Sequence, residues 1–398
     1  MPSPTREDMW RKQLGLKVEL LPKVLPRSYC FSTKWKPNEY IGTEFEVEGY
    51  HLPETLTYYW DVKGDDSLRR PPGEGGGAYE YVAKKPVSPE FFKKKTLPYL
   101  HKHLHKSPCK TKFSLRCSTH VHVGVHQLYF YQVFLMAGLY HIIEDTLWPL
   151  LGENREGFLF CLGASTSRQI PIALTSAVNG DTFTSVFQYD CFKYTSLNLR
   201  TMFNLGTIEF RGMEGTLDKD RLSVWIDLLD NLRSYAMSIK PWQAAGILNT
   251  MSASGPLEFF KDLIGEEPYK YILKLHGGNT QKLEHLLYEG INNMQPLFYE
   301  PEWAGIERVD EIPEDLTPFT GMKKRPTRMP RRPNGISPST WAAVWSSDPE
   351  HAQQIADQHY GSSSQSTPQS LSSAAQQFYT IDDVVSSSFS DDDEEVDE

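Results

Sequence analysis

Acidic side chains stand at every second position in part of the segment IGTEFEVEGY, residues 41–50. Glu44, Glu46 and Glu48 alternate there with apolar residues, a pattern typical of a β-strand. Because strand side chains alternate between faces, the three carboxylates must share one face. Such crowding is found on solvated strand faces and at cation sites, and this strand alone slightly favours the solvated face.

Two histidines show the same spacing in a second strand-like segment. His120 and His122 lie in STHVHVG, residues 118–124, with valines on the opposite face. A His-x-His pair on a strand recurs in metal sites, but two ordinary histidines would produce the same pattern. The pair is therefore evidence for a metal site only if other strands add ligands to the same face.

Two further strands complete a set of functional groups. Glu209 and Arg211 share one face of TIEFRGM (207–213), and Glu80 lies in YEYVAK (79–84). Four strands then each offer polar groups on one face and apolar groups on the other, so one sheet could bring the polar groups together. Solvated faces rarely collect Glu, His and Arg in this way, and we interpret the set as a functional site.

The residue types indicate which ligands such a site would take. Carboxylates with one or two imidazoles suit Mg²⁺ or Mn²⁺ better than zinc, which prefers more thiolate or imidazole ligands. An arginine beside a carboxylate-bound metal indicates an anionic group, most simply a phosphate. The sequence has no G-x-x-x-x-G-K-[ST] loop and no G-x-S-x-G elbow. A P-loop site and an α/β-hydrolase triad are therefore not expected.

The elements that must position these groups indicate an α+β fold. Strands are expected over 41–50, 79–84, 120–126 and 206–213. Helical spacing of apolar residues predicts long helices over about 128–151 and 219–238. The stretch 241–300 is expected to be mostly helical, with breaks at Pro256 and at Gly277.

Composition limits the class of protein. The 398-residue chain has a net charge of −10, so it is a poor general binder of nucleic acid. Its five cysteines are odd in number and include no C-x-x-C, which favours a reducing compartment. The first residues lack the apolar stretch of a signal peptide, and polar residues interrupt the most apolar segment, 128–151. We therefore expect a soluble, cytoplasmic protein with no membrane partner.

Four regions are expected along the chain. Residues 1–36 form an N-terminal arm, and residues 37–311 form the main domain. Residues 312–345 are a basic, proline-rich linker, and residues 346–398 are a Ser/Gln-rich tail that ends in DDDEEVDE. Few apolar residues and high charge prevent a packed core in that tail, so it is expected to be disordered.

Six segments, in this order, resemble the amidoligase family. They are GTEFEVE (42–48), GDDSL (64–68), EYVAKKPV (80–87), STHVHVG (118–124), YTSLNL (194–199) and TIEFRGMEGTLD (207–218). The family is a branch of the carboxylate–amine ligases that includes glutamine synthetase and glutamate–cysteine ligase. The resemblance covers about residues 37–235. It implies a glutamine-synthetase-like fold, a curved and mainly antiparallel sheet flanked by helices.

The resemblance also implies an activity and a role for each matching residue. The activity is ATP-dependent amide formation through an acyl phosphate, with two or three Mg²⁺ or Mn²⁺ ions and with carboxylate and amine substrates that are small molecules, peptides or proteins. The implied metal ligands are Glu44, Glu46, Glu80, His120 and Glu209. The implied catalytic residues are Arg211, Glu209 and Lys193, and the implied substrate- or nucleotide-binding residues are His122, Tyr194, Asn198 and Arg155.

Two other readings of the sequence are open. A metal-dependent hydrolase could use the same Glu and His residues to activate water without a nucleotide. A non-catalytic interaction protein could keep the fold and act through its charged C-terminal tail.

Overall fold

The computed structural model describes residues 38–298, except 126–127, 153, 160, 168, 179–192, 241–242 and 245, together with residues 355, 356 and 358. The chain divides into two compact units, Met1–Lys323 and Lys324–Glu398. All elements below belong to the first unit. The arm expected over 1–36, the linker over 312–345 and nearly all of the tail over 346–398 lie outside the described residues.

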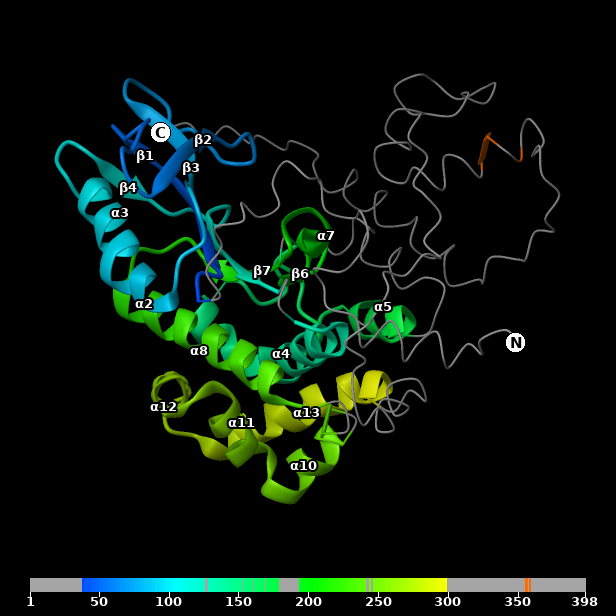
Figure 1. Cartoon of the computed structure of the whole chain (residues 1–398). Coiled ribbons are helices and arrows are strands. Elements are labelled where there is room, and N and C mark those ends of the chain that lie inside the picture. The colour runs from blue at the N-terminus through cyan, green and yellow to red at the C-terminus, as the bar shows by residue number, and fades with distance from the viewer. Residues whose placement is uncertain are drawn as a thin grey trace, which may run out of the picture. The chain divides into compact units, whose positions relative to one another are not determined.

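This unit contains a seven-stranded sheet (Figure 1). Its strands are β1 (Ile41–Tyr50), β2 (Trp60–Gly64), β3 (Gly76–Ala83), β4 (Lys110–Lys112), β5 (Ser118–Gly124), β6 (Leu197–Asn198) and β7 (Thr207–Glu214). Their order is β2-β3-β1-β5-β7-β6, and β4 pairs with β1. Every pairing is antiparallel. The expected α+β class with a curved antiparallel sheet is confirmed.

The described helices lie between the strands and after them. They are α2 (Pro89–Phe91), the π-helix η2 (Phe92–Thr96), α3 (Leu97–Leu104), α4 (Phe130–Leu151), α5 (Gln169–Val178), α7 (Thr201–Leu205), α8 (Lys219–Ser238), α10 (Ile247–Ser254), α11 (Pro256–Ile264), α12 (Glu266–Leu275) and α13 (Thr280–Phe298). The two predicted long helices are α4 and α8. The two predicted breaks are also confirmed, because Pro256 begins α11 and Gly277 lies between α12 and α13.

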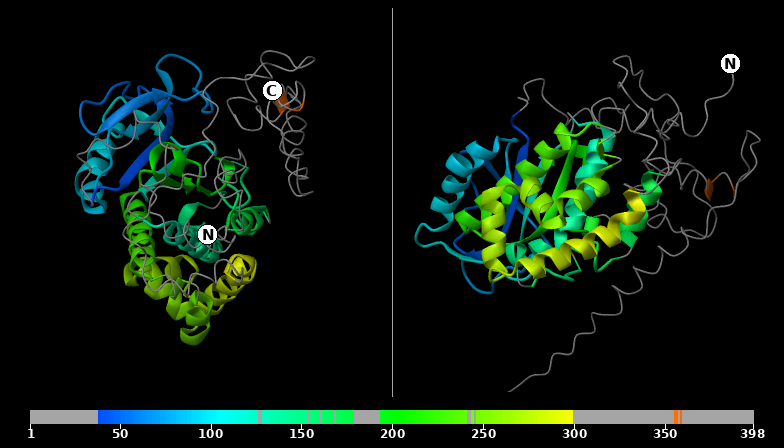
Figure 2. Two further views of the ribbon diagram at one scale, coloured as in Figure 1. Left: turned by 45° about the vertical axis from the view of Figure 1, so that its right-hand side comes forward. Right: turned by 90° about the horizontal axis from the view of Figure 1, so that it is seen from below.

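The helices form layers on the sheet. Helices α4 and α8 run side by side along its apolar face, and α10 to α13 pack on their far side (Figures 1 and 2). Asp218 fixes the start of α8, since its carboxylate accepts hydrogen bonds from the backbone N–H groups of Asp220 and Arg221. Among the described residues, no helix is both long enough and apolar enough to cross a membrane.

The core lies between the sheet and α4 and α8. The apolar residues that alternate with the acidic ones in β1, such as Phe45 and Val47, are completely buried. Phe210 of β7 contacts the rings of Tyr140 on α4 and Trp225 on α8, with ring centroids 5.0 and 6.0 Å apart. The alternation of apolar and polar residues in the sequence predicted this apolar face. Because the apolar side chains of each strand are buried against the helices, the polar side chains must project from the opposite face of the sheet.

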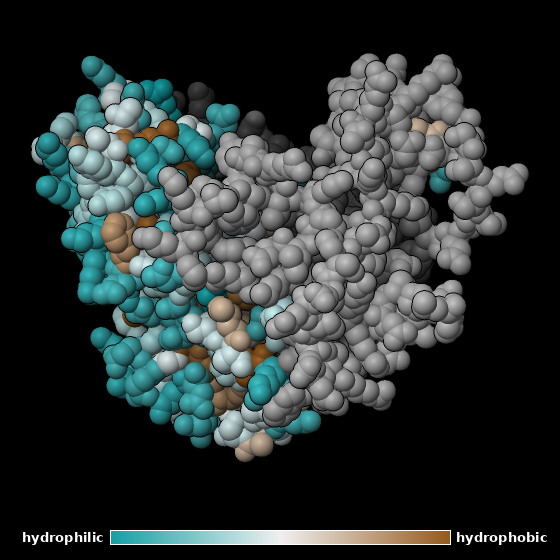
Figure 3. Space-filling view, viewed as in Figure 1, coloured by the Kyte–Doolittle hydropathy of each residue, from teal (hydrophilic) through white to brown (hydrophobic). Residues whose placement is uncertain are grey.

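Helix α3 is amphipathic. Leu97, Leu100 and Leu104 are buried, whereas Lys102 is exposed. The surface over α2 and α3 is accordingly mostly hydrophilic (Figure 3). Cysteines in the described part of the chain, Cys109, Cys117 and Cys161, are free thiols.

Candidate metal site

The cross-strand register brings the predicted site residues to one face of the sheet. Three pairs stand directly opposite each other: Glu44 with His120, Glu46 with Glu80, and His122 with Glu209. Opposed residues of antiparallel strands project from the same face, about 4.5–5.5 Å apart at their Cβ atoms. Asn198 of β6 stands opposite Glu209 and extends the row to a fifth strand.

The imidazole of His120 lies among three carboxylates. Its Nδ1 is 3.1 Å from Oε1 of Glu209 and 3.5 Å from Oε2 of Glu44. Its Nε2 is 3.9 Å from Oε1 of Glu46. Burial and the nearby Arg211 lower the pKa of His120, but the hydrogen bonds to Glu209 and Glu44 outweigh them and raise it to about 9. The two carboxylates thus favour the protonated form of the His120 imidazole.

His122 occupies a different position in the same cluster. Its Nδ1 lies 3.0 Å from the hydroxyl oxygen of Thr207, which fixes the ring. Its Nε2 lies 3.3 Å from Oε1 of Glu44 and 4.0 Å from Oε1 of Glu209. Neither contact has hydrogen-bond geometry, so Nε2 is a buried ring nitrogen without a hydrogen-bond partner. A buried nitrogen held in this way between two carboxylates is suited to bind a cation.

Crowded carboxyl groups give a second reason to expect a cation. Burial and the charge of Glu44 raise the pKa of Glu80 to about 7, and a hydrogen bond joins the two side chains. Burial acts to raise the pKa of Glu44 as well, but the two histidines hold it well below its usual range. A proton or a divalent ion between these carboxyl groups would relieve their repulsion.

Three of these side chains fit a divalent ion directly. One ligand atom each from Glu44, His122 and Glu209 lies within 4.8 Å of the others. Two carboxylate oxygens and one imidazole nitrogen suit Mg²⁺ or Mn²⁺. The resemblance assigned His122 to the nucleotide and His120 to the metal. In the structure His122 belongs to this trio, while His120 lies beside it within the same cluster.

Glu209 is held by neighbours on both oxygens. Asn198 donates from Nδ2 to Oε2 at 2.6 Å, and Arg211 donates from Nη1 to Oε1 at 2.6 Å. Burial would raise the pKa of Glu209, but His120, His122 and Arg211 together keep it far below its usual range. Glu209 is therefore an ionised carboxylate, and Asn198 and Arg211 fix its orientation.

A β-bulge sets the position of Arg211. The ladder between β5 and β7 shifts by one residue, so that Arg211 and Gly212 together face His120. Buried Arg155 donates from Nη2 to the carbonyl of Arg211 at 2.9 Å and from Nε to that of Gly212 at 3.1 Å. The resemblance implied that Arg155 binds nucleotide or substrate. In the structure its guanidinium instead donates hydrogen bonds to two backbone carbonyls of the bulge.

Lys193 and Tyr194 lie further out, in the segment that leads to β6. Both side chains are exposed, and Nζ of Lys193 lies 5.7 Å from the centroid of the Tyr194 ring. Lys193 forms no ion pair with any carboxylate in the part of the chain that the structure describes. The structure therefore does not pair Lys193 with the carboxylate cluster.

Ser118 is a site residue that sequence reasoning missed. Its backbone N–H donates to Oε2 of Glu46 at 2.7 Å, and its hydroxyl donates to the same oxygen. The hydroxyl oxygen also lies 2.8 Å from Nε2 of His120. The alternation in STHVHVG places Ser118 on the same face as His120, and this pattern could have identified Ser118 from the sequence. Thr207, which lies beside His122, was also missed, although the alternation in TIEFRGM places it on the face of Glu209.

Comparison with known protein families and with curated proteins gave no match to this chain. Function is therefore inferred from the chemistry of the site.

Proposed function

We propose that this chain is an ATP-dependent carboxylate–amine ligase with a glutamine-synthetase-like sheet. The observation that carries the proposal is the convergence of Glu44, His122 and Glu209 on one sheet face, with Arg211 bonded to Glu209. A cation site with an adjoining guanidinium suits the polyphosphate of a nucleotide. The resemblance in ordered motifs supports the same activity.

The side chains of the cluster divide into ion-binding and positioning groups. Glu44, His122 and Glu209 would hold the first of two or three Mg²⁺ or Mn²⁺ ions, with Glu46 and Glu80 adjacent to them. Bound divalent ions would offset the negative charge of the ATP phosphates. Asn198 holds the Glu209 carboxylate in a fixed orientation through its 2.6 Å hydrogen bond.

Arg211 is the group best suited to contact the transferred phosphoryl group. Its Nη1 is bonded to Glu209, whereas its Nε is buried and has no hydrogen-bond partner. A guanidinium held in place with an unused donor is suited to bind an anionic oxygen. Arg155 maintains this position by bonding the carbonyls of the bulge.

The proposed reaction has two steps. A substrate carboxylate oxygen attacks the γ-phosphorus of ATP, which gives an acyl phosphate and releases ADP. An amine then attacks the acyl carbon, inorganic phosphate leaves, and loss of a proton from nitrogen gives the amide. The protein's part is to align the two reactants and to stabilise the charge on the phosphoryl oxygens.

The test is phosphate release by the purified full chain with ATP, Mg²⁺ and panels of carboxylic acids and amines. A ligase releases phosphate in proportion to amide formed, and full turnover needs both an acid and an amine. A metal-dependent hydrolase at the same site would instead cleave esters or amides at an unchanged rate without ATP. That outcome, with loss of the hydrolysis in Glu209→Gln, would replace the ligase with the rival.

A further inference from the structure

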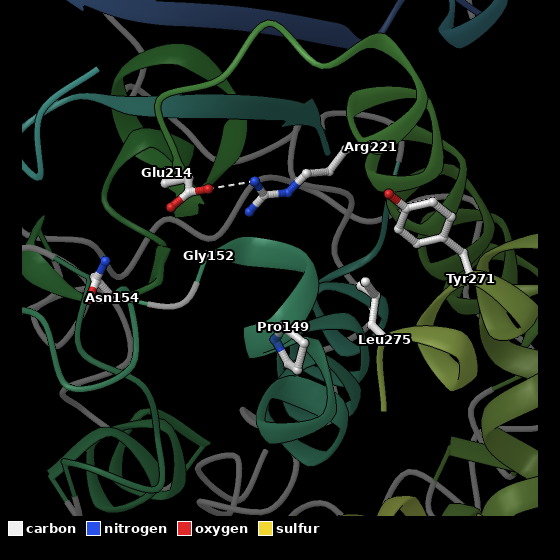
Figure 4. A pocket seen from close by; sticks show the side chains of 7 residues that line it. All are labelled: Pro149, Gly152, Asn154, Glu214, Arg221, Tyr271 and Leu275. Atoms are coloured by element: carbon white, nitrogen blue, oxygen red, sulfur yellow. Dashed lines mark hydrogen bonds and ion pairs between the residues drawn. The ribbon is translucent and has the colours of Figure 1, made fainter. Parts of the chain in front are cut away.

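A second site lies where four elements meet, at the ends of α4 and β7, the first turn of α8, and α12 (Figure 4). The cavity there has a volume of about 280 Å³. It is lined by Pro149, Gly152, Asn154, Glu214, Arg221, Tyr271 and Leu275. None of these residues belongs to the carboxylate cluster. Cavities for drug-sized ligands typically measure about 300–1,000 Å³, so this one suits a smaller molecule.

Arg221 brings an unused hydrogen-bond donor to the cavity. Its Nη1 pairs with Oε1 of Glu214, and its Nε donates to the carbonyl of Leu150 near the end of α4. Its Nη2 is buried and has no hydrogen-bond partner. In Figure 4 the free nitrogen of Arg221 is directed into the space between the lining side chains. Buried donors are rarely left unpaired, so this one indicates a ligand acceptor.

Glu214 brings the matching acceptor. One of its oxygens pairs with Arg221, while Oε2 lies against Gly152, where an added Cβ would be only 2.4 Å away. Gly152 has a φ of 138°, a conformation that also favours glycine. Within the described part of the chain, Oε2 takes no hydrogen bond. A donor and an acceptor therefore stand side by side at one end of the cavity.

The rest of the wall is largely apolar. Pro149 and Leu275 line it with hydrocarbon, and the ring of Tyr271 lies beside Leu275 (Figure 4). We propose that this cavity binds a zwitterionic α-amino acid with an apolar side chain. Its carboxylate would accept from Nη2 of Arg221, its ammonium group would donate to Oε2 of Glu214, and its side chain would pack on Leu275 and Pro149.

The test is calorimetric titration of the full chain with L-leucine, L-methionine and L-phenylalanine, without ATP or metal. At least one should bind, and the matching analogues that lack either charged group should bind at least tenfold more weakly. For L-leucine these are 3-methylbutylamine and 4-methylpentanoate. Because neither nucleotide nor ion is present, the result is independent of the ligase proposal.

Variants locate the binding. Leu275→Trp should fill the cavity and weaken binding at least tenfold, whereas Ile172→Trp, at a similarly exposed apolar position on α5, should leave it unchanged. Arg221→Lys keeps a cation beside Glu214 but has a single nitrogen in place of the guanidinium fork, and should also weaken binding. Circular dichroism and melting temperature establish that each variant is folded. The proposal is overturned if no amino acid binds at millimolar concentration, if the single-charge analogues bind equally well, or if Leu275→Trp binds like the parent.

Discussion

Nη2 of Arg155 lies 2.9 Å from the carbonyl oxygen of Arg211. Through this bond Arg155, a buried residue in the loop after α4, supports the backbone of Arg211. The guanidinium of Arg211 in turn binds Glu209. A bulge leaves carbonyls without ladder partners, and the fork of one arginine satisfies two of them here.

Arg155→Lys is expected to destabilise the protein. Lysine keeps the charge but loses the fork that reaches both carbonyls, so the cost is about 1–3 kcal/mol for a buried acceptor left unpaired. Urea unfolding measures it. Arg69→Lys, at an exposed side chain, is the control and should change stability by less than about 0.5 kcal/mol. Equal stability of the two variants would show that Arg155 does not hold the bulge.

Divalent ions are expected to raise the melting temperature. An ion that binds only the folded chain adds about 2.7 kcal/mol at one hundred times its Kd. Mn²⁺ and Mg²⁺ should both act, EDTA should reverse the shift, and His122→Gln should abolish it. The control is Glu267→Gln at an exposed carboxylate, which should retain the full shift. A shift of the same size in His122→Gln would place the ion elsewhere.

Asn198→Ala is expected to weaken metal binding by about 10–100-fold while leaving the ligands in place. The amide holds Oε2 of Glu209 at 2.6 Å, and residues that orient a ligand typically contribute this much. Isothermal titration with Mn²⁺ gives the affinity. Wild-type affinity in a folded Asn198→Ala protein would mean that Arg211 alone is sufficient to orient Glu209.

Glu209→Gln is expected to abolish ATP turnover in a protein that still folds, because the site loses an ionised ligand. Arg211→Lys is expected to lower the rate by about 10²-fold or more, since a fixed fork becomes a mobile point charge. Phosphate release with acid and amine present measures both. Arg69→Lys should retain the parent rate. Turnover at the parent rate in Glu209→Gln would remove that residue from the chemistry.

Gly290→Ala is expected to destabilise the packing of α13 on α4. A Cβ at this position would lie 2.0 Å from the carbonyl oxygen of Ile142, which is backbone and cannot rotate away. Separating the helices should cost about 1–3 kcal/mol, although alanine is the better helix former. Asn292→Ala, exposed on the same helix, should be neutral or slightly stabilising in the same unfolding experiment.

The strands that carry the site were predictable because their alternation is regular. In β1 the acidic and apolar residues separate cleanly, and the predicted bounds agree with Ile41–Tyr50. Short β2, β4 and β6 were not predicted, since two to five residues carry too little periodicity. Their existence depends on neighbours distant in sequence, such as the pairing of Leu197 with Phe210.

The composition of the site was more predictable than its geometry. Spacing showed that His120 and His122 share a face, but not which carboxylates each of them contacts or which ring nitrogen is left without a hydrogen-bond partner. The register between β1, β5 and β7 decides this, and register follows from packing across the whole sheet. The role of Arg155 could not be read from the sequence either, because a one-residue bulge leaves no local pattern.

The central position of β1 has a consequence for biosynthesis. Glu44 is synthesised before its partners on β5 and β7, from which long stretches of the chain separate it. The proposed ion site includes Glu209, so it is incomplete until the residues of β7 have been synthesised. Metal binding is therefore expected only after β1, β5 and β7 have paired. Because this pairing joins segments distant in sequence, metal binding would be a late step of folding.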